Sequence, residues 1–242
     1  MREVVALVMA GGRGERMRRS GVDAPKPLVT VAGTSLLERN VRVLLHWGFD
    51  RIVVSTPSAE PSIGSHVEAL QPVVAAAGGD LRTLTESEPL GNIGCAGLLR
   101  GHARHVLVVF ADNLTSLDLR TVVQGHRDSG AGLTLAAHEH GVRVPYGRLD
   151  LEGDRVVGYT EKPTVQVTVA SAITVLGPEA LAALPGDEAC GLVDLTRRLV
   201  HDGVLVRAHR HEADWVDVND SGGLEAAEAL VRRHPEFFLP AP

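Results

Sequence analysis

The feature of this sequence that most constrains its fold is an alternation of strand-length and helix-length segments along residues 1–130. Short apolar runs bounded by glycine or polar residues alternate with segments whose apolar residues recur at helical spacing. The predicted strands are Val4–Met9, Arg51–Ser55, Leu81–Thr85 and His105–Ala111, and the predicted helices are Ser35–Trp47, Ser62–Leu70, Asn92–Arg100 and Leu117–Gly125. This alternation predicts an α/β fold with a mostly parallel, doubly wound sheet.

Residues 131–242 show a different pattern, with strand segments that follow one another closely. Glu152-Gly153-Asp154 is typical of a hairpin turn. The predicted strands are Gly132–His138, Gly147–Leu151, Arg155–Thr160, Val167–Leu176 and Val204–His209, and the predicted helices are Pro178–Leu184, Val193–His201 and Leu224–His234. Because no repeat, low-complexity tract or linker separates the two patterns, we expect one domain over residues 1–242 with an antiparallel-rich second half.

Composition excludes several classes of partner. The 242 residues are 44% hydrophobic, which is ample for a core. The net charge is −6, and the charged residues are interspersed along the chain, which argues against nucleic acid or a membrane surface as the main partner. The apolar run before Gly11 is too short for a signal peptide, so we expect a cytoplasmic protein. Cys95 and Cys190 are too few for a disulfide framework and are expected to be reduced thiols.

Two lysines stand against twenty-two arginines, and each lysine precedes a proline, in Pro25-Lys26-Pro27 and Glu161-Lys162-Pro163. An ammonium is a compact charge on a slim stem, whereas a guanidinium is a broad planar fork. A crowded phosphate site is one reason to keep lysine, and chance survival in an arginine-rich composition is the other. The neighbouring motifs therefore have to decide between these interpretations.

A glycine cluster, Met9-Ala10-Gly11-Gly12-Arg13-Gly14-Glu15-Arg16-Met17, follows the first predicted strand. Glycines allow backbone amides to approach phosphate oxygens closely. The cluster lacks the third glycine of the dinucleotide fingerprint, because Met17 occupies that place, and it lacks the lysine and hydroxyl residue that end a P-loop. Taken alone, it fits a phosphate-binding loop or a simple tight turn.

Taken together, the motifs resemble those of the sugar-1-phosphate nucleotidyltransferases, and most closely the mannose-1-phosphate guanylyltransferase-like members. The glycine cluster with Arg16 is followed at the family's distance by Pro25-Lys26-Pro27-Leu28. The later motifs occur in the family's order and are Glu88-Pro89-Leu90-Gly91, Phe110-Ala111-Asp112-Asn113, Tyr146-Gly147, Glu161-Lys162-Pro163 and Trp215-Val216-Asp217. The resemblance implies a Rossmann-like, GT-A-like fold, with a nucleotide-binding half over about residues 1–130 and a sugar-phosphate-binding half over about 131–242.

The resemblance also assigns roles to individual residues. It implies phosphate-binding catalytic residues at Arg16, Lys26 and Lys162, and Mg²⁺ ligands at Asp112 and Asp217. It implies nucleotide contacts from Ala10, Gly11, Gly12, Gly14, Glu88 and Gly91, and sugar-phosphate contacts from Tyr146, Gly147, Glu161, Lys162 and Ala170. The reaction would join a nucleoside triphosphate to a sugar phosphate and release pyrophosphate. A regulatory module that binds the same ligands without turnover is the alternative, and a homodimer is a further expectation.

Two positions bear on the substrates. A carboxylate at Glu88 can accept hydrogen bonds from N1–H and N2–H of guanine and would face the O4 acceptor of thymine or uracil unfavourably, which favours GTP. A thymidylyl-, uridylyl- or cytidylyltransferase is the alternative. Ala170 and Ala172 stand where the family strand has asparagine and glycine, so an amide that would bind sugar hydroxyls is missing. We therefore expect an atypical sugar-1-phosphate or a cyclitol phosphate, unless the strand is locally re-paired. The chain ends soon after Leu224–His234, so a β-helix tail with acyltransferase activity is not expected.

Overall fold

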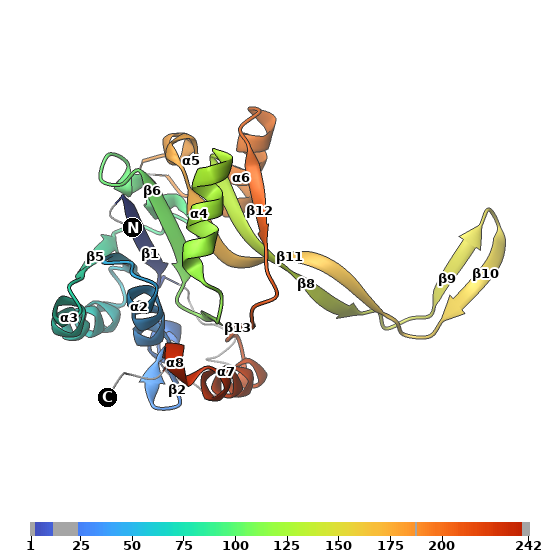
Figure 1. Cartoon of the computed structure of the whole chain (residues 1–242), viewed down its shortest axis with the longest axis horizontal. Coiled ribbons are helices and arrows are strands. Elements are labelled where there is room, and N and C mark those ends of the chain that lie inside the picture. Colours follow the sequence, from blue (N-terminus) through green and yellow to red (C-terminus); the bar gives the residue numbers. More distant parts are fainter. Residues whose placement is uncertain (1–2, 12–23, 187, 239–242) are drawn as a thin grey trace.

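The computed structural model describes residues 3–11, 24–186 and 188–238, and its centre is a seven-stranded sheet (Figure 1). The strand order is β12-β8-β11-β6-β1-β4-β5, so one sheet joins strands from both halves of the chain. Its strands are β1 (Val4–Met9), β4 (Arg51–Pro57), β5 (Asp80–Glu86), β6 (His105–Phe110), β8 (Leu133–Arg143), β11 (Thr164–Leu176) and β12 (Val206–Arg210). All neighbouring pairs are parallel except those that β11 makes with β6 and β8. The predicted mostly parallel α/β sheet is confirmed.

Helices cover both faces of this sheet, which explains why β1 is an uninterrupted apolar run. Val4, Ala6 and Val8 pack on one face, and Val5, Leu7 and Met9 pack on the other. The first face is covered by α2 (Leu36–His46), α3 (Pro61–Ala76), α4 (Leu119–Ser129), α7 (Ser221–Arg233) and α8 (Pro235–Phe238). The second face is covered by η2 (Gly94–Leu99), α5 (Pro178–Ala183) and α6 (Leu192–His201).

Two helix predictions need correction. The segment predicted as the helix Asn92–Arg100 contains only the 3-10 helix η2, Gly94–Leu99. A Cβ on Gly97 would lie 2.8 Å from the carbonyl oxygen of Pro185, so this segment approaches another backbone too closely for ordinary side chains. The helix predicted at Ser62–Leu70 runs on to Ala76 with Pro72 inside it. Packing of Ile63, Val67, Leu70 and Val74 against the sheet offsets the lost hydrogen bond at the proline.

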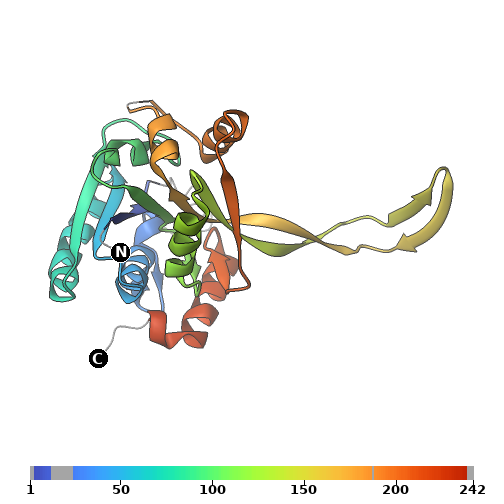
Figure 2. The same ribbon diagram turned by 45° about the horizontal axis from the view of Figure 1, so that its top comes forward.

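A long arm projects from the sheet, and the sequence does not predict it. Strands β8 and β11 continue past the body as a two-stranded ribbon whose register runs from Ala137↔Ala170 to Arg143↔Thr164. A second ribbon at the end pairs β9 (Arg148–Glu152) with β10 (Arg155–Thr160) around the predicted turn, where Gly153 has a φ of 60°. Residues 138–170 therefore form an arm that reaches away from the body (Figures 1 and 2).

Two small ribbons complete the fold. β7 (Asn113–Thr115) pairs with β13 (Trp215–Asp217), and β2 (Thr30–Val31) pairs with β3 (Thr34–Ser35). The fully buried guanidinium of Arg39 on α2 donates hydrogen bonds to carbonyl oxygens of Val31, Ala32 and Phe238, so it ties the second ribbon and α8 to the body. Across the described ranges, we find no helix with the length and apolar character needed to cross a membrane.

Candidate functional site

A cleft of about 690 Å³ lies at the carboxyl edge of the parallel strands. This is the edge at which open α/β sheets bind ligands. The described walls come from the ends of β1, β4, β5 and β6 and from the segments that follow them. They comprise Met9, Ala10, Gly11, Pro25, Lys26, Pro27, Pro57, Ala59, Glu60, Ile63, Glu86, Pro89, Gly91, Asn92, Phe110, Ala111 and Asp112.

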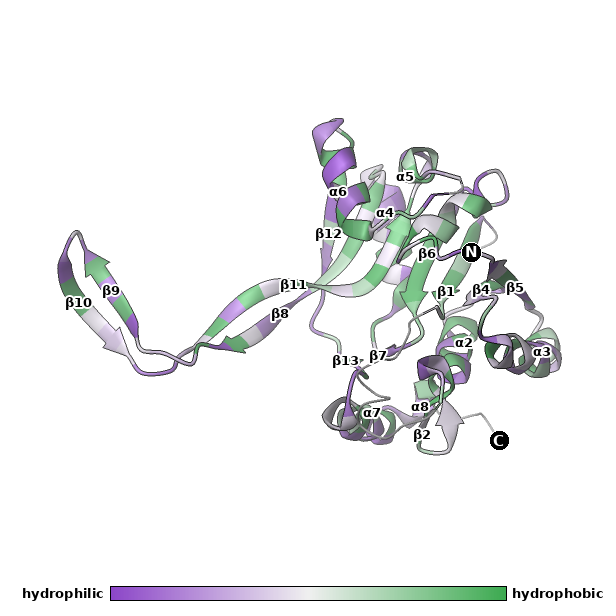
Figure 3. Ribbon diagram, turned by 180° about the vertical axis from the view of Figure 1, so that it is seen from behind, coloured by the Kyte–Doolittle hydropathy of each residue, from purple (hydrophilic) through white to green (hydrophobic). Residues whose placement is uncertain are grey.

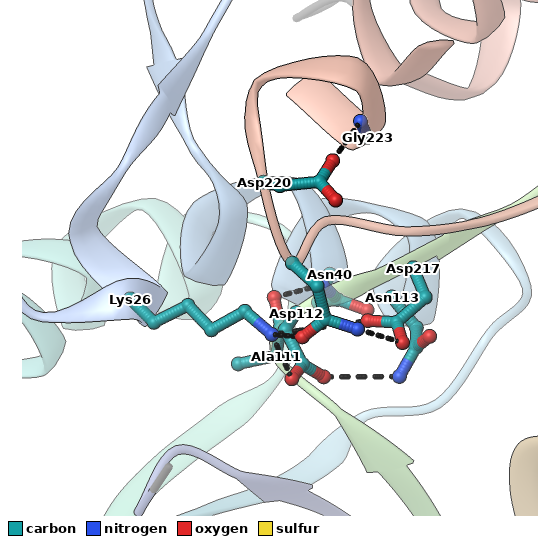
Figure 4. A network of polar contacts seen from close by, with 9 residues as sticks. Lys26, Asn40, Ala111, Asp112, Asn113, Asp217, Asp220 and Gly223 are labelled. Atoms are coloured by element: carbon teal, nitrogen blue, oxygen red, sulfur yellow. Dashed lines mark hydrogen bonds and ion pairs between the residues drawn. The ribbon is translucent and has the colours of Figure 1, made fainter. Parts of the chain in front are cut away.

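Lys26 is the one cation among the described walls of this cleft, and the residue is only 6% exposed. It opens the 3-10 helix η1 (Lys26–Leu28), with a proline on each side to restrict the backbone. Its Nζ lies 2.6 Å from Asp112 Oδ2 and 3.8 Å from Asp217 Oδ1, and it also donates to Asn219 Oδ1 (Figure 4). The predicted phosphate lysine and the two predicted metal ligands are therefore in one cluster.

The short ribbon of β7 and β13 brings the two carboxylates together from positions far apart in the chain. Asp112 lies two residues after the last residue of the buried strand β6, and its backbone carbonyl accepts a hydrogen bond from Val218 N at 2.9 Å. Asp217 ends β13 opposite Asn113 of β7. Asn113 Nδ2 donates to Asp112 Oδ1 at 3.0 Å, and Asn219 Nδ2 donates to Asp217 Oδ2. Neighbouring amides therefore help to fix the orientation of both carboxylates beside Lys26.

The donor set around Lys26 fits a magnesium ion that also binds substrate phosphates. Mg²⁺ in nucleotide sites typically uses one or two carboxylates, with phosphate oxygens and waters as the other ligands. The ammonium of Lys26 already marks a position where Asp112 and Asp217 face a cation. Within residues 3–11, 24–186 and 188–238, no group of three or more His, Cys, Asp or Glu side chains is placed to hold a metal ion by itself.

Glu86 places a buried carboxylate in the cleft, and it was not among the predicted site residues. Glu86 ends β5 and is buried, with Ser55 Oγ donating to Oε1 and Leu90 N donating to Oε2 at 3.0 Å. Glu88, the residue expected to contact the base, is exposed and is absent from the described cleft walls. The signal available in the sequence was the position of Glu86 at a strand end, which is also the position that identified Asp112.

Gly91 shapes the same wall. Its φ is 78°, and a Cβ there would lie 2.5 Å from the carbonyl oxygen of Cys190. Hydrogen bonds from Cys190 N to Leu90 O and from Ile93 N to Cys190 O hold the two segments together. Only glycine fits this position without a backbone shift, and the nucleotide contact expected of Gly91 stays a prediction.

The cysteines lie under the cleft rather than in it. Cys95 is fully buried, with its Sγ 3.4 Å from Met9 Sδ. Burial raises the pKa of its thiol to about 12, and burial also raises the pKa of the Cys190 thiol. Neither thiol has the lowered pKa that a nucleophile needs.

The sugar-phosphate residues predicted on the arm are not brought to the cleft. Tyr146, Gly147, Glu161 and Lys162 lie where the two ribbons of the arm meet, and none is among the described cleft walls. Tyr159 donates from its hydroxyl to Glu161 Oε2 at 2.6 Å, and Lys162 Nζ lies 3.8 Å from Glu161 Oε1. Lys162 also has a φ of 45°. Non-glycine residues in this left-handed region are uncommon and tend to occur at functional sites.

At the base of the arm, the strand that carries Ala170 is re-paired. The register of β11 against β8 shifts between Ala170 and Thr174, with Ala172 at a φ of 55°, so the alternative of a local change in register describes this segment. Ser171 becomes fully buried, and its Oγ lies 2.8 Å from both His138 Nδ1 and His211 Nε2. Burial lowers the pKa of both histidines. Ala170 itself is exposed.

The glycine loop is described only at its start. Ala10 and Gly11 line the cleft, and Ala10 N donates to Ser55 O at 3.0 Å. The predicted residues Gly12, Gly14 and Arg16 lie outside the described residues.

A family model described as "Nucleotidyl transferase" matches residues 5–232. The chain belongs to the nucleotidyl transferase family. The matched range contains the whole cleft and the arm, which confirms the family predicted from the ordered motifs.

Two curated relatives and one solved structure illustrate that similarity. A mannose-1-phosphate guanylyltransferase of Mycobacterium tuberculosis is 31% identical over 68% of this chain and 47% of the relative. A glucose-1-phosphate adenylyltransferase of Streptomyces coelicolor is 28% identical over 91% of this chain and 56% of the relative. The chain thus spans about half the length of these relatives. The crystal structure of HddC from Yersinia pseudotuberculosis shares the fold, with a TM-score of 0.70 and 24% identity over 93% of this chain and 98% of HddC.

Proposed function

We propose that this protein transfers a nucleotidyl group from a nucleoside triphosphate, with GTP favoured, to a sugar-1-phosphate or cyclitol phosphate. The observation that carries the proposal is the cluster of Lys26, Asp112 and Asp217 at the carboxyl edge of the sheet. A buried ammonium flanked by two carboxylates beside a deep cleft suits a substrate that combines a base with a triphosphate. Membership of the nucleotidyl transferase family supports the same reaction class.

In this reaction an oxygen of the acceptor phosphate forms a bond to the α-phosphorus of the triphosphate. The bond from that phosphorus to the β-phosphate oxygen breaks, and pyrophosphate leaves with the electron pair. Two anions must be held together in line, so charge neutralisation and positioning are most of the catalytic task. Lys26 would bind phosphate oxygens on the triphosphate side, with the start of the glycine loop at Ala10 and Gly11 beside it. Lys162 would bind the acceptor phosphate.

Asp112 and Asp217 would hold Mg²⁺. The ion, when bound, supplies positive charge to the phosphate oxygens. Lys26 contacts both carboxylates in this structure. When substrate binds, the carboxylates would contact Mg²⁺, and Lys26 would contact phosphate oxygens. Asn113 and Asn219 keep both carboxylates oriented in either state.

The preference for GTP is supported by a carboxylate inside the cleft and by the guanylyltransferase named among the curated relatives. A carboxylate can accept from both N1–H and N2–H of guanine, and it meets the O4 acceptor of uracil or thymine unfavourably. Glu86 occupies the cleft, whereas Glu88 is the residue that the motif resemblance indicates. The relatives also include an adenylyltransferase and a uridylyltransferase, so ATP and UTP are the competing nucleotide substrates.

The proposed acceptor is an atypical sugar-1-phosphate or a cyclitol phosphate, because Ala170 offers no amide to a sugar hydroxyl. The register change that follows Ala170 does not supply a replacement, because it buries Ser171 against His138 and His211. We also propose a cytoplasmic homodimer. Two buried, unpaired cysteines suit a reducing compartment.

A pyrophosphate-release assay tests the function directly. GTP, ATP, UTP, dTTP and CTP are each combined with mannose-1-phosphate, glucose-1-phosphate, heptose-1-phosphate and inositol-1-phosphate, with and without Mg²⁺. We expect release that depends on Mg²⁺ and is fastest with GTP. Binding of nucleotide, measured by calorimetry, without pyrophosphate release in any combination would contradict the enzyme and favour the regulatory module.

A further inference from the structure

The ribbon of β9 and β10 at the end of the arm has one apolar face and one polar face. The cross-strand pairs Leu149–Tyr159 and Leu151–Val156 share a face, and these four residues are 48%, 63%, 59% and 54% exposed. The alternate positions pair Asp150 with Gly158 and Glu152 with Arg155. Figure 3 shows hydrophobic residues along both strands of this ribbon. A two-stranded hairpin is marginally stable in water unless its apolar face packs on something.

The arm begins at the edge of the sheet where the cleft lies. β8 is antiparallel to β11, which is antiparallel to β6, so β8 and β6 run in the same direction. The end of β8 and the end of β6, which Asp112 follows, are therefore on the same edge of the sheet. From that edge the arm extends outward, away from its own body (Figures 1 and 3).

The arm carries the residue that the proposed reaction still needs. Lys162 is held in a left-handed backbone conformation just before Pro163, at the elbow between the two ribbons. Exposed cations gather at this elbow, with Arg143 and Arg148 on the strands that flank it. Arg148 and Lys162 each have a carboxylate beside them, Asp150 at 3.3 Å and Glu161 at 3.8 Å. None of these elbow residues is among the described walls of the chain's own cleft, so the cleft that Lys162 can serve without a change in the arm is that of another copy.

We propose that the arm, residues 138–170, is exchanged between two copies of this chain, so that Lys162 of one copy completes the acceptor-phosphate site of the other. This inference rests on the proposed function. A two-fold arrangement makes each contact twice, so one exchange covers two apolar ribbon faces and supplies a lysine to two clefts. A second copy of this chain is therefore sufficient to cover the ribbon face and to complete the cleft. The segment is also comparable in length to one side of a standard protein interface, which uses about 20–30 residues.

Complementation between two defective chains tests the exchange. One chain carries Asp112→Asn with Lys162 intact, and the other carries Lys162→Met with Asp112 intact. The two are co-expressed with different affinity tags, and the mixed dimer is isolated by tandem purification. If the arm acts in trans, one of the two sites in the mixed dimer is fully wild type. We expect about half the wild-type rate per dimer, while each parent falls by about 10²–10³-fold.

If the arm folds onto its own cleft, every chain in the mixed dimer keeps a defect in its own site, and activity stays at the level of the parents. That result overturns the exchange. Wild-type protein measured in parallel separates this failure from failure of the proposed function, in which the wild type itself would release no pyrophosphate.

Light scattering gives a readout that needs no turnover. The double change Leu151→Glu and Val156→Lys places a charge pair on the apolar ribbon face, and we expect it to convert the dimer into a monomer. The matched control reverses the opposite pair, Glu152→Arg with Arg155→Glu, on the polar face of the same ribbon. The control should stay dimeric. A wild-type monomer at micromolar concentration, or equal behaviour of the two variants, would overturn the proposal.

Discussion

Lys26 Nζ and Asp112 Oδ2 lie 2.6 Å apart across 86 positions of sequence, and the lysine side chain is only 7% exposed. Among the described residues, this ion pair connects η1 on one side of the cleft to the segment that follows β6 on the other.

We predict that Asp112→Asn lowers kcat by about 10²–10³-fold, because it removes a preorganised charge contact while keeping the shape of the side chain. Lys26→Arg should also be impaired, since a planar guanidinium does not fit a space shaped for a narrow ammonium. Steady-state rates of pyrophosphate release measure both effects. Asp202→Asn, on the exposed surface, is the control and should retain the wild-type rate. Near-normal turnover in Asp112→Asn would contradict the assignment of Asp112 as a metal ligand.

The two glutamates near β5 give a test of base recognition. We predict that Glu86→Gln raises KM for GTP by about tenfold or more and lowers the preference for GTP over ITP, which lacks the 2-amino group. Glu88→Gln is the matched variant two positions along, and its exposed side chain should leave both values near wild type. The opposite pattern would assign the base contact to Glu88. An unchanged preference in both variants would contradict recognition of guanine by either carboxylate.

The parts of the site that depend on local sequence could be predicted, and the parts that depend on contacts between distant residues could not. Each motif around Lys26, Asp112 and Asp217 was visible locally, because strand ends and proline-flanked turns are local features. Their meeting depends on the pairing of β7 with β13, two three-residue strands far apart in the chain that carry little signal of their own. The motif Glu88-Pro89-Leu90-Gly91 directed the prediction to Glu88, whereas the burial that distinguishes Glu86 depends on the folded sheet.

The fold shows the same division. β1, β4, β5 and β6 were predicted within one or two residues, because buried parallel strands read as short runs between turns. The lengths of β8 and β11 were underestimated, since the arm continues through polar and β-branched residues whose pairing is set by the partner strand. Thr164 and Gln166 alternate with Val165 and Val167, which is a strand pattern, so the start of β11 carried a signal that the predicted bound at Val167 left out.

Gly91 offers a prediction on stability. We expect Gly91→Ala to lower the free energy of unfolding by about 2–4 kcal/mol, because it adds a contact of 2.5 Å with the Cys190 carbonyl to the cost of a positive φ. Gly101→Ala is the matched control, since Gly101 has a similar φ of 80° with no atom within 4 Å of a new Cβ. That variant should lose only about 1 kcal/mol. Urea unfolding of both variants gives the comparison, and equal losses would contradict the steric argument.

A buried histidine predicts how stability depends on pH. His126 is 1% exposed, its Nδ1 lies 2.9 Å from Thr134 Oγ1, and burial lowers its pKa from 6.5 to about 4. Between these two values the unfolded chain binds more protons than the folded chain, so stability is fully present above pH 6.5 and falls as the pH drops toward 4. The loss attributable to this residue is up to about 3 kcal/mol.

Urea unfolding at pH 7.5 and at pH 5 measures this dependence. His126→Asn keeps a polar group near Thr134 but cannot titrate, so its stability should decline less over the same interval. His201→Asn changes an exposed histidine and should decline like the wild type. Parallel decline in all three proteins would show that His126 is not the group responsible.

The acceptor pocket gives the last prediction, and it concerns Ala170. If the missing amide is what excludes ordinary hexose phosphates, Ala170→Asn should raise kcat/KM for mannose-1-phosphate or glucose-1-phosphate by about tenfold, which is the effect of one good hydrogen bond of about 1.4 kcal/mol. Thr168→Asn is the control, because it adds an amide to the same face of β11 two residues earlier and should give no gain. The wild type should prefer a cyclitol phosphate or an atypical sugar phosphate. A wild-type kcat/KM for mannose-1-phosphate of about 10⁴ M⁻¹s⁻¹ or more, within the ordinary enzyme range, would contradict the altered pocket.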